Sequence, residues 1–270
     1  MRERDAALAA ADATRDEVVT EVPSVSIEGL AVARLDGAAV VDHVASELTA
    51  GRGGWLVTAN VDFLQRASTD SAARALYSEA DLIVADGAPL VWISKLRGEP
   101  VPERVAGADL VWSLAEMAAA AGHGIYLLGG DGQAAPLAAE RLIERYPGLR
   151  IAGYSSPWVS SPPTDVELEP IRAELRNSGA RLIYVALGSP KQEELIRALR
   201  TEFPEIWWMG CGISLGFVAG HVERAPRWMQ RCGLEWAHRL LQEPGRLTSR
   251  YLTRNLPFTL RLLWSAGRAR

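Results

Sequence analysis

Short apolar runs alternate with helical patterns along most of this chain of 270 residues. The runs are rich in Val, Ile and Leu, which is typical of strands buried on both faces of a parallel sheet. Because strands and helices alternate, we predict an α/β fold with a doubly wound, mostly parallel sheet and right-handed crossovers. Strands are expected at 25–32, 55–58, 82–85, 124–129, 150–154, 181–188 and 207–209. Helices are expected at 36–49, 61–79, 88–96, 107–121, 133–146, 165–178 and 189–201, and through the chain after 222.

Charge is distributed unevenly along the chain. The formal net charge is −4, yet residues 224–270 contain ten Arg, no Lys and two acidic residues. That segment therefore carries about +8 and the remainder about −12, and such a basic end favours contact with an anionic ligand or surface. We divide the chain into a mobile N-terminal tail (1–23), an α/β domain (24–221) and a basic helical C-terminal appendage (222–270).

Cysteine content and hydropathy indicate the compartment. The two cysteines, Cys211 and Cys232, do not make a disulfide framework, so a reducing compartment is expected. No run of about 18 apolar residues is present, and no charged-then-apolar signal segment opens the chain. The sequence predicts a soluble, cytoplasmic protein that can still lie on a membrane surface.

The predicted strand at 82–85 ends on a carboxylate followed by glycine, Asp86 and Gly87. In open α/β sheets, ligands bind beyond the carboxyl ends of the strands, where Asp86 falls. An aspartate that is partly desolvated there has a raised pKa, which suits a group that takes a proton. The alternative is structural, with Asp86 capping the helix that follows.

Other predicted strands also end on glycine or polar residues. Thr58 and Asn60 follow one strand, and Gly129 and Gly130 follow another. The glycine pair has three interpretations: a phosphate site at a helix start, a dinucleotide-binding turn, or a turn without a ligand. A dinucleotide site requires an acidic residue after the next strand, but that strand ends Tyr-Ser-Ser, which argues against NAD.

The strand with the strongest apolar pattern ends at Gly188. A helix with Pro190 in its first turn follows, and it begins with a cation, an amide and a carboxylate: Lys191, Gln192 and Glu193. Lys191 is one of only two lysines in the chain, and Gln192 suits bidentate recognition of a base or a sugar. The alternative is a capped helix with a solvated charge pair.

Several other kinds of site are not expected. The chain has no Asp-x-Asp pair and no P-loop. Its four histidines are scattered and form no His/Cys cluster with ligand spacing, so a metal site is not predicted.

The basic end carries the most specific pattern in the chain. Residues 224–228 read Arg-Ala-Pro-Arg-Trp, 233–236 read Gly-Leu-Glu-Trp, 243–246 read Glu-Pro-Gly-Arg and 250–251 read Arg-Tyr. They are preceded, in order, by Thr58-Ala-Asn60, Asp86-Gly87, Arg104-Val-Ala-Gly-Ala-Asp109, Gly129-Gly130 and the Gly-Ser-Pro-Lys-Gln-Glu segment. With these motifs the chain resembles the WecG/TagA/CpsF family of glycosyltransferases over residues 27–251, all but the tails.

The resemblance implies a Rossmann-like fold and glycosyl transfer with inversion, in the assembly of cell-surface polysaccharide. The implied donor is a UDP-sugar, typically UDP-N-acetylmannosamine or the derived uronic acid. The implied acceptor is a sugar on polyprenyl pyrophosphate at the inner face of the plasma membrane. Catalysis is implied to need no metal or other cofactor, with Asp86 as general base and Thr58 as a second catalytic residue. The appendage of the family closes over the active site and meets the membrane, which makes residues 24–221 the catalytic domain.

Departure of UDP without a metal requires positive charge from side chains, and guanidinium groups suit a diphosphate. Arg239, Arg246 and Arg250 are spaced by seven and four residues, so one continuous helix places them on one face. The alternative is a solvated helix surface, which normally contains acids and lysines as well. We expect substrate contacts from Asn60, Arg104, Gly129, Gly130, Gly188, Pro190, Lys191, Gln192, Glu193, Arg224, Arg239, Arg246 and Arg250.

Residues 252–270 interleave arginines with leucines, Phe258 and Trp264. Such a basic amphipathic stretch can lie on anionic lipid, with each basic residue contributing roughly 1 kcal/mol near the surface. The alternative is a helix packed on the α/β domain.

Two positions depart from the family pattern. Gly216 stands where the family has an acidic residue, and Pro89 is unusual so soon after Asp86. Since glycine has no side chain to bond a sugar, the donor stays open between N-acetylmannosamine, its uronic acid, glucose and other hexoses. Two other functions are kept as alternatives: a catalytically inactive nucleotide-sugar-binding protein and an NAD(P)-dependent oxidoreductase. No nucleic-acid partner is expected, and the oligomeric state stays open, a homo-oligomer included.

Overall fold

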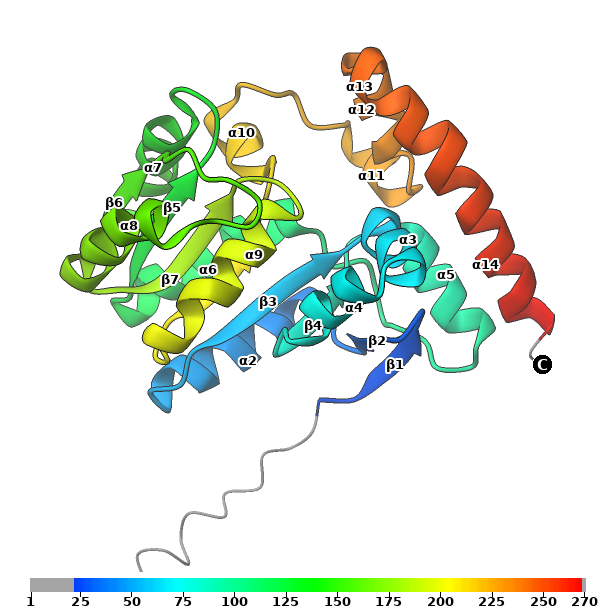
Figure 1. The fold of residues 1–270 in the computed structure, drawn as a ribbon, viewed down its shortest axis with the longest axis horizontal. Coiled ribbons are helices and arrows are strands. Elements are labelled where there is room, and N and C mark those ends of the chain that lie inside the picture. Colours follow the sequence, from blue (N-terminus) through cyan, green and yellow to red (C-terminus); the bar gives the residue numbers. More distant parts are fainter. Residues whose placement is uncertain (1–21, 269–270) are drawn as a thin grey trace, which may run out of the picture.

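The computed structural model describes residues 22–268, which form one sheet with helices on both faces (Figure 1). The sheet has eight strands in the order β1-β2-β4-β3-β8-β7-β5-β6, and every neighbouring pair except β1–β2 is parallel. The predicted α/β fold with a mostly parallel sheet is confirmed. The strands are β1 (Ser24–Ile27), β2 (Leu30–Ala33), β3 (Gly54–Ala59), β4 (Leu82–Ala85), β5 (Gly124–Gly129), β6 (Arg150–Ser155), β7 (Ala180–Ala186) and β8 (Trp207–Gly210).

Two hydrophobic cores hold the sheet, one on each face. Every residue of β3, β4, β5 and β8 is buried, as expected for parallel strands covered on both sides. One core joins the sheet to α2 (Gly37–Thr49), α6 (Gly107–Ala121), α7 (Ala134–Arg145) and α10 (Ser214–Ala219). The other joins it to α3 (Val61–Thr69), α4 (Ser71–Ser78), α5 (Ala88–Leu96), α8 (Asp165–Ser178) and α9 (Lys191–Leu199), after which η1 (Arg200–Glu202) adds a 3₁₀ turn. Polar groups that bind a ligand must therefore come from the ends of the strands.

Two of the predicted elements are divided in the structure. The strand expected at 25–32 is a hairpin of β1 and β2, because Glu28 and Gly29 both have positive φ, 52° and 82°. Two such residues in succession are typical of the type I′ turn that joins antiparallel strands. The helix expected at 61–79 is α3 followed by α4, and Asp70 ends the first and caps the second. The other elements expected before residue 210 lie within two residues of their predicted ends.

The appendage is a series of helices that lies against α3 and α5 (Figure 1). It contains α11 (Arg227–Arg231), α12 (Glu235–Gln242), α13 (Pro244–Thr248), the π-helical segment η2 (Ser249–Asn255) and α14 (Leu256–Arg268). Residues 1–21 of the predicted tail, and residues 269–270, lie outside the described part of the chain. Within residues 22–268, no helix is both long and apolar enough to span a bilayer.

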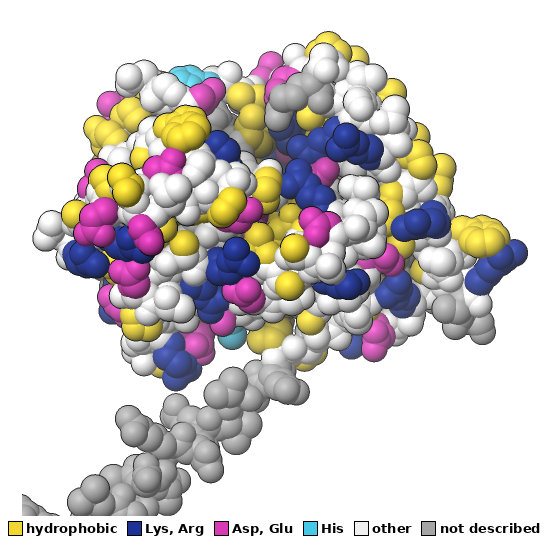
Figure 2. Space-filling model, viewed as in Figure 1, with side chains coloured by type: hydrophobic (Ala, Val, Ile, Leu, Met, Phe, Trp, Pro, Cys, Tyr) yellow, Lys and Arg dark blue, Asp and Glu magenta, His cyan; other side chains and the backbone are white. Residues whose placement is uncertain are grey.

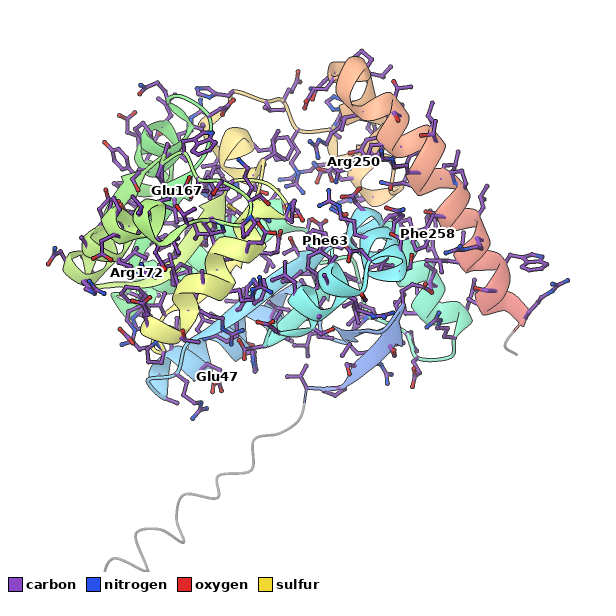
Figure 3. The ribbon with its side chains drawn as sticks, in the orientation of Figure 1. Glu47, Phe63, Glu167, Arg172, Arg250 and Phe258 are labelled. Carbon is purple, nitrogen blue, oxygen red and sulfur yellow. The ribbon has the colours of Figure 1, made fainter. Side chains whose placement is uncertain are left out.

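The last helix is amphipathic, and one of its faces packs on the α/β domain. Its buried side chains join the core beside α5, where Phe258 points (Figure 3): Phe258, Leu262 and Ala266. The alternative of a helix packed on the α/β domain is therefore confirmed for this face. The opposite face keeps large apolar side chains exposed: Leu256, Leu260 and Trp264.

Candidate active site

Asp86 lies at the carboxyl end of β4, beside the carboxyl end of β3. Ala85 pairs in register with Ala59, and the Asp86 amide donates to the Ala59 carbonyl oxygen at 2.8 Å. The amide of Val105 donates to the Ala85 carbonyl oxygen at 2.9 Å, which brings the segment ahead of α6 over the same edge. Asp86 is therefore held between the end of β3 and the start of α6.

The Asp86 carboxylate meets a backbone amide and a guanidinium group. Its Oδ2 accepts a hydrogen bond from the Gly107 amide at 3.2 Å, and its Oδ1 lies 3.7 Å from Nη1 of Arg104. The pKa of Asp86 is raised to about 6, mainly by burial and to a smaller extent by Glu235, although Arg104, the Gly107 amide and Arg224 act to lower it. A carboxylate with such a pKa is ionised at neutral pH and is a stronger base than an ordinary aspartate.

Asp86 does not cap the helix that follows it, so the structural alternative is wrong. No side chain caps α5, whose N-cap residue is Gly87. Asp86 instead accepts from Gly107, the first residue of α6, and a carboxylate is favoured at the positive end of a helix.

Thr58 and Asn60 lie beside Asp86 at the end of β3. Thr58 is buried beneath the start of α6, and a Cβ on Gly107 would lie only 3.0 Å from the Thr58 Oγ1 atom. The Asn60 Oδ1 atom caps α3, and the Asn60 backbone lies against Gly87. The structure therefore brings three of the predicted site residues together at one edge of the sheet.

Arg104 and Arg224 are joined by the carboxylate of Glu235. Arg104 Nη1 donates to Glu235 Oε2 at 2.9 Å, and Arg224 Nε donates to Glu235 Oε1 at 3.2 Å. Arg224 also forms a bidentate pair with Asp109 in the first turn of α6, at 2.5 Å and 2.9 Å. Although burial opposes it, this pairing lowers the pKa of Asp109. We call these five residues the base network: Asp86, Arg104, Asp109, Arg224 and Glu235.

The sequence does not single out Asp109 or Glu235 as site residues, yet both belong to the motifs that carry the family resemblance. Glu235 is one of only two acids in the segment 224–270. The scarcity of acids among so many arginines is the signal that could have indicated a site residue there.

Arg250 reaches the α/β domain at the start of α3 (Figure 3). Its Nε and Nη2 atoms lie 3.0 Å and 2.8 Å from the carboxylate of Asp62, which is buried. Arg66 pairs with the same carboxylate at 2.9 Å and donates to Ser189 Oγ at 3.3 Å. The sequence gives no signal for Asp62 and Arg66, because an acid and an arginine four residues apart are ordinary on a helix.

Lys and Arg side chains gather where the appendage meets the α/β domain (Figure 2).

The predicted glycines lie at the carboxyl ends of β5 and β7. Gly129 and Gly130 both have positive φ, 96° and 89°, and a Cβ on Gly129 would lie 2.8 Å from the Ala186 carbonyl oxygen. Gly188 also has a positive φ, 75°, where β7 leads into α9. These backbone conformations explain why glycine occupies the positions without requiring a ligand.

The first turn of α9 is occupied by contacts within the protein. Gln192 donates to Glu193 at 2.7 Å and accepts from the Gly212 amide at 3.2 Å, and both side chains are buried. Burial raises the pKa of Glu193, so the alternative of a solvated charge pair is wrong. Lys191, which follows the N-cap residue Pro190, donates to the carbonyl oxygen of a neighbouring loop at 2.9 Å and lies over the ring of Trp158.

The expectation that Arg239, Arg246 and Arg250 share one helix face is wrong. The helix is broken at Glu243, with φ −129° and ψ 58°, and Pro244 then starts α13. Proline cannot continue α12 because it lacks the amide hydrogen. Arg250 falls in η2, and Arg239 lies 3.9 Å from Glu243. The side chain of Arg246 lies outside the described part of the structure.

In the described part of the chain, no three His, Cys, Asp or Glu side chains are grouped so that they could hold a metal ion.

Comparison with known proteins identifies the family. The model of the glycosyl transferase WecG/TagA/CpsF family matches residues 25–270. The chain belongs to the WecG/TagA/CpsF family of glycosyltransferases. It is 34% identical over 218 residues to the N-acetylglucosaminyldiphosphoundecaprenol N-acetyl-beta-D-mannosaminyltransferase of Bacillus spizizenii, covering 76% of this chain and 82% of that protein. The protein is an enzyme, and the oxidoreductase alternative is wrong.

A WecG/TagA/CpsF glycosyltransferase can use the groups at this edge of the sheet. A carboxylate with a raised pKa can accept a hydroxyl proton, and guanidinium groups can stabilise a departing diphosphate.

The two departures from the family pattern do not disturb the fold. Gly216 is buried in α10, with Val222 the nearest side chain, 3.5 Å from where a Cβ would stand. Pro89 lies in the first turn of α5, where proline is favoured.

Proposed function

We propose that this enzyme transfers a hexosyl or N-acetylhexosaminyl group, of the N-acetylmannosamine type, from a UDP-sugar to a sugar on polyprenyl diphosphate. The reaction inverts the anomeric centre, needs no metal, and belongs to the synthesis of cell-wall polysaccharide. The Bacillus relative is named for transfer of N-acetylmannosamine to a lipid-linked N-acetylglucosamine, which supports the type of transferred sugar and the acceptor class.

The position of Asp86 at the carboxyl edge of the sheet is the observation that carries this proposal: its carboxylate accepts from the Gly107 amide, lies 3.7 Å from Arg104, and has a raised pKa because of burial. Asp86 takes the proton from the acceptor hydroxyl as that oxygen attacks the anomeric carbon. The bond between that carbon and the UDP oxygen breaks, and UDP leaves with the electron pair. Attack from the side opposite UDP inverts the configuration.

Positive charge for the departing UDP comes from the arginines of the base network and from Arg66 and Arg250. Each of these arginines already pairs with a carboxylate, either Glu235, Asp109 or Asp62. The carboxylates hold the guanidinium groups in place before the substrate arrives, so little reorganisation is needed when a diphosphate binds.

Radiolabelled UDP-sugars and a short-chain polyprenyl diphosphate carrying N-acetylglucosamine test the proposal. We expect transfer from one of UDP-N-acetylmannosamine, its uronic acid or UDP-glucose, at a rate that EDTA does not change. Binding of every donor without turnover would contradict the proposed transfer. Transfer abolished by EDTA and restored by a divalent cation would contradict the metal-independent reaction.

We also propose that the appendage holds the enzyme on the inner face of the plasma membrane, where a lipid-linked acceptor is located. The exposed apolar face of α14 carries Leu256, Leu260 and Trp264. Arg261 and Arg268 lie over aromatic rings of the same helix. Apolar side chains with arginines beside them suit a surface of anionic lipid.

Vesicle sedimentation tests this membrane contact. Replacing both Leu260 and Trp264 with serine should lower the partition coefficient for anionic vesicles by about tenfold or more, because the burial of two large apolar side chains is lost. Val166→Ser serves as the control, since Val166 is also highly exposed but lies on α8. Equal binding by the double variant and the unmodified enzyme would contradict the proposal.

A further inference from the structure

Glu235 links the appendage to Arg104, the arginine beside the proposed base Asp86. Glu235 is the first residue of α12, and only 17% of its side chain is exposed. Arg104 Nη1 lies between two carboxylates, 2.9 Å from Glu235 Oε2 and 3.7 Å from Asp86 Oδ1. The direct hydrogen bond of Arg104 therefore goes to the appendage, and Asp86 keeps only the longer contact.

The turn ahead of α12 fixes how closely Glu235 approaches. Gly233 has a φ of 72°, and a Cβ there would lie 2.6 Å from Cβ of Ala88, the first residue of α5. Ala88 stands only two residues after Asp86, so the appendage contacts the segment that carries the base. A backbone approach this close leaves no room for a side chain.

We propose that Glu235 is a positioning residue that holds Arg104 away from Asp86, so that the base is set for proton transfer only while the appendage is docked. The inference rests on the proposed function of Asp86. It adds a specific role for the appendage. Through Glu235, the appendage gives Arg104 a second carboxylate to pair with, so that Arg104 does not bond directly to Asp86.

Removal of the Glu235 charge has a predictable effect on Asp86. Arg104 is then free to form a direct charge-assisted bond with Asp86, at about 2.7–2.9 Å. Such a bond stabilises the ionised carboxylate, lowers its pKa and weakens it as a base. Arg224 cannot replace Glu235, because it is itself a cation and stays paired with Asp109.

The charged groups that act on Asp86 come from both parts of the protein. Arg104 precedes α6 and the Gly107 amide begins that helix, and both favour the ionised form of Asp86. Glu235 and Arg224 come from the appendage and act in opposite directions. The variant Glu235→Gln removes the one appendage charge that opposes ionisation of Asp86.

The test is the pH dependence of kcat/KM for Glu235→Gln. In this pH profile, the acid limb is the range over which kcat/KM rises as the base ionises. We expect that limb to move to lower pH by about one unit or more, and kcat/KM above the limb to fall roughly three- to tenfold. Glu235→Asp keeps the charge, and its limb should stay close to that of the unmodified enzyme. Glu243→Gln is the matched control, because it makes the same substitution at the other acid of segment 224–270 and should leave the limb in place.

A lower rate for Glu235→Gln with an unmoved acid limb would overturn the inference and leave Glu235 as a docking contact. Asp86→Asn separates this failure from a failure of the proposed function. If the acid limb survives in Asp86→Asn, the base assignment falls, and the inference falls with it. If the limb is lost in Asp86→Asn but unmoved in Glu235→Gln, only the inference is wrong.

Discussion

Asp86→Asn is expected to lower kcat by about 10²- to 10⁴-fold, the usual contribution of a general base. Asparagine is nearly the same size as aspartate and can still accept from the Gly107 amide through its side-chain oxygen. It cannot take a proton from the acceptor hydroxyl. The loss should therefore fall on kcat, with little change in binding of the donor.

Stability measurements show whether the Asp86 variant remains folded. The pKa of Asp86 is raised from 3.8 to about 6 in the folded state, so the free energy of unfolding contributed by this group falls as pH rises from about 3.8 to about 6. Asp86→Asn removes that decline and should unfold at neutral pH at the same or a higher temperature. Asp70→Asn is the control, because asparagine caps a helix as well as aspartate does. A folded Asp86→Asn enzyme that transfers sugar at the unmodified rate would contradict the base assignment.

Deletion of residues 224–270 is expected to reduce transfer by roughly 10³-fold or more. The deletion removes Arg224, Glu235 and Arg250 together, and charge-assisted hydrogen bonds contribute about 1.5–3 kcal/mol each. All strands of the described sheet precede the cut, so circular dichroism should show the α/β domain folded. The deletion also uncovers apolar surface on α5 that Phe258 and Leu262 cover, so it is best measured in mild detergent.

A point variant tests the same role of the appendage in the intact chain. Gly233→Ala places a Cβ 2.6 Å from Ala88, at a φ that favours glycine, and should reduce transfer roughly tenfold by loosening the docked appendage. Gly245→Ala is the matched control, because a Cβ there meets no atom within 4 Å. Unchanged activity in both the deletion and Gly233→Ala would show that the appendage is not part of the active site.

The sequence predicts most of the fold because strands and helices here are set by local apolar patterns. Asp86 is placed correctly for the same reason, since a strand that ends on an acid brings it to the sheet edge. The hairpin at Glu28 is missed because its turn lacks the usual Asn-Gly or Asp-Gly pair. The place of β8 between β3 and β7 is set by tertiary packing and has no local signal.

The candidate site is predicted less completely because its contacts join residues far apart in the chain. Asp62 and Arg250 are 188 positions apart, and Arg104 and Glu235 are 131 apart. The spacing of Arg239, Arg246 and Arg250 predicts one shared helix face. That prediction is wrong because Pro244 starts a new helix. The family motifs contain Glu235, but only the structure shows which arginines it joins.

The pH dependence of kcat/KM, measured for the unmodified enzyme and for Asp86→Asn, tests most directly whether Asp86 is the base. We predict that activity of the unmodified enzyme falls below about pH 6, as Asp86 becomes protonated, and that this acid limb is absent from the residual activity of the variant. An acid limb that persists unchanged in Asp86→Asn would show that another group takes the proton.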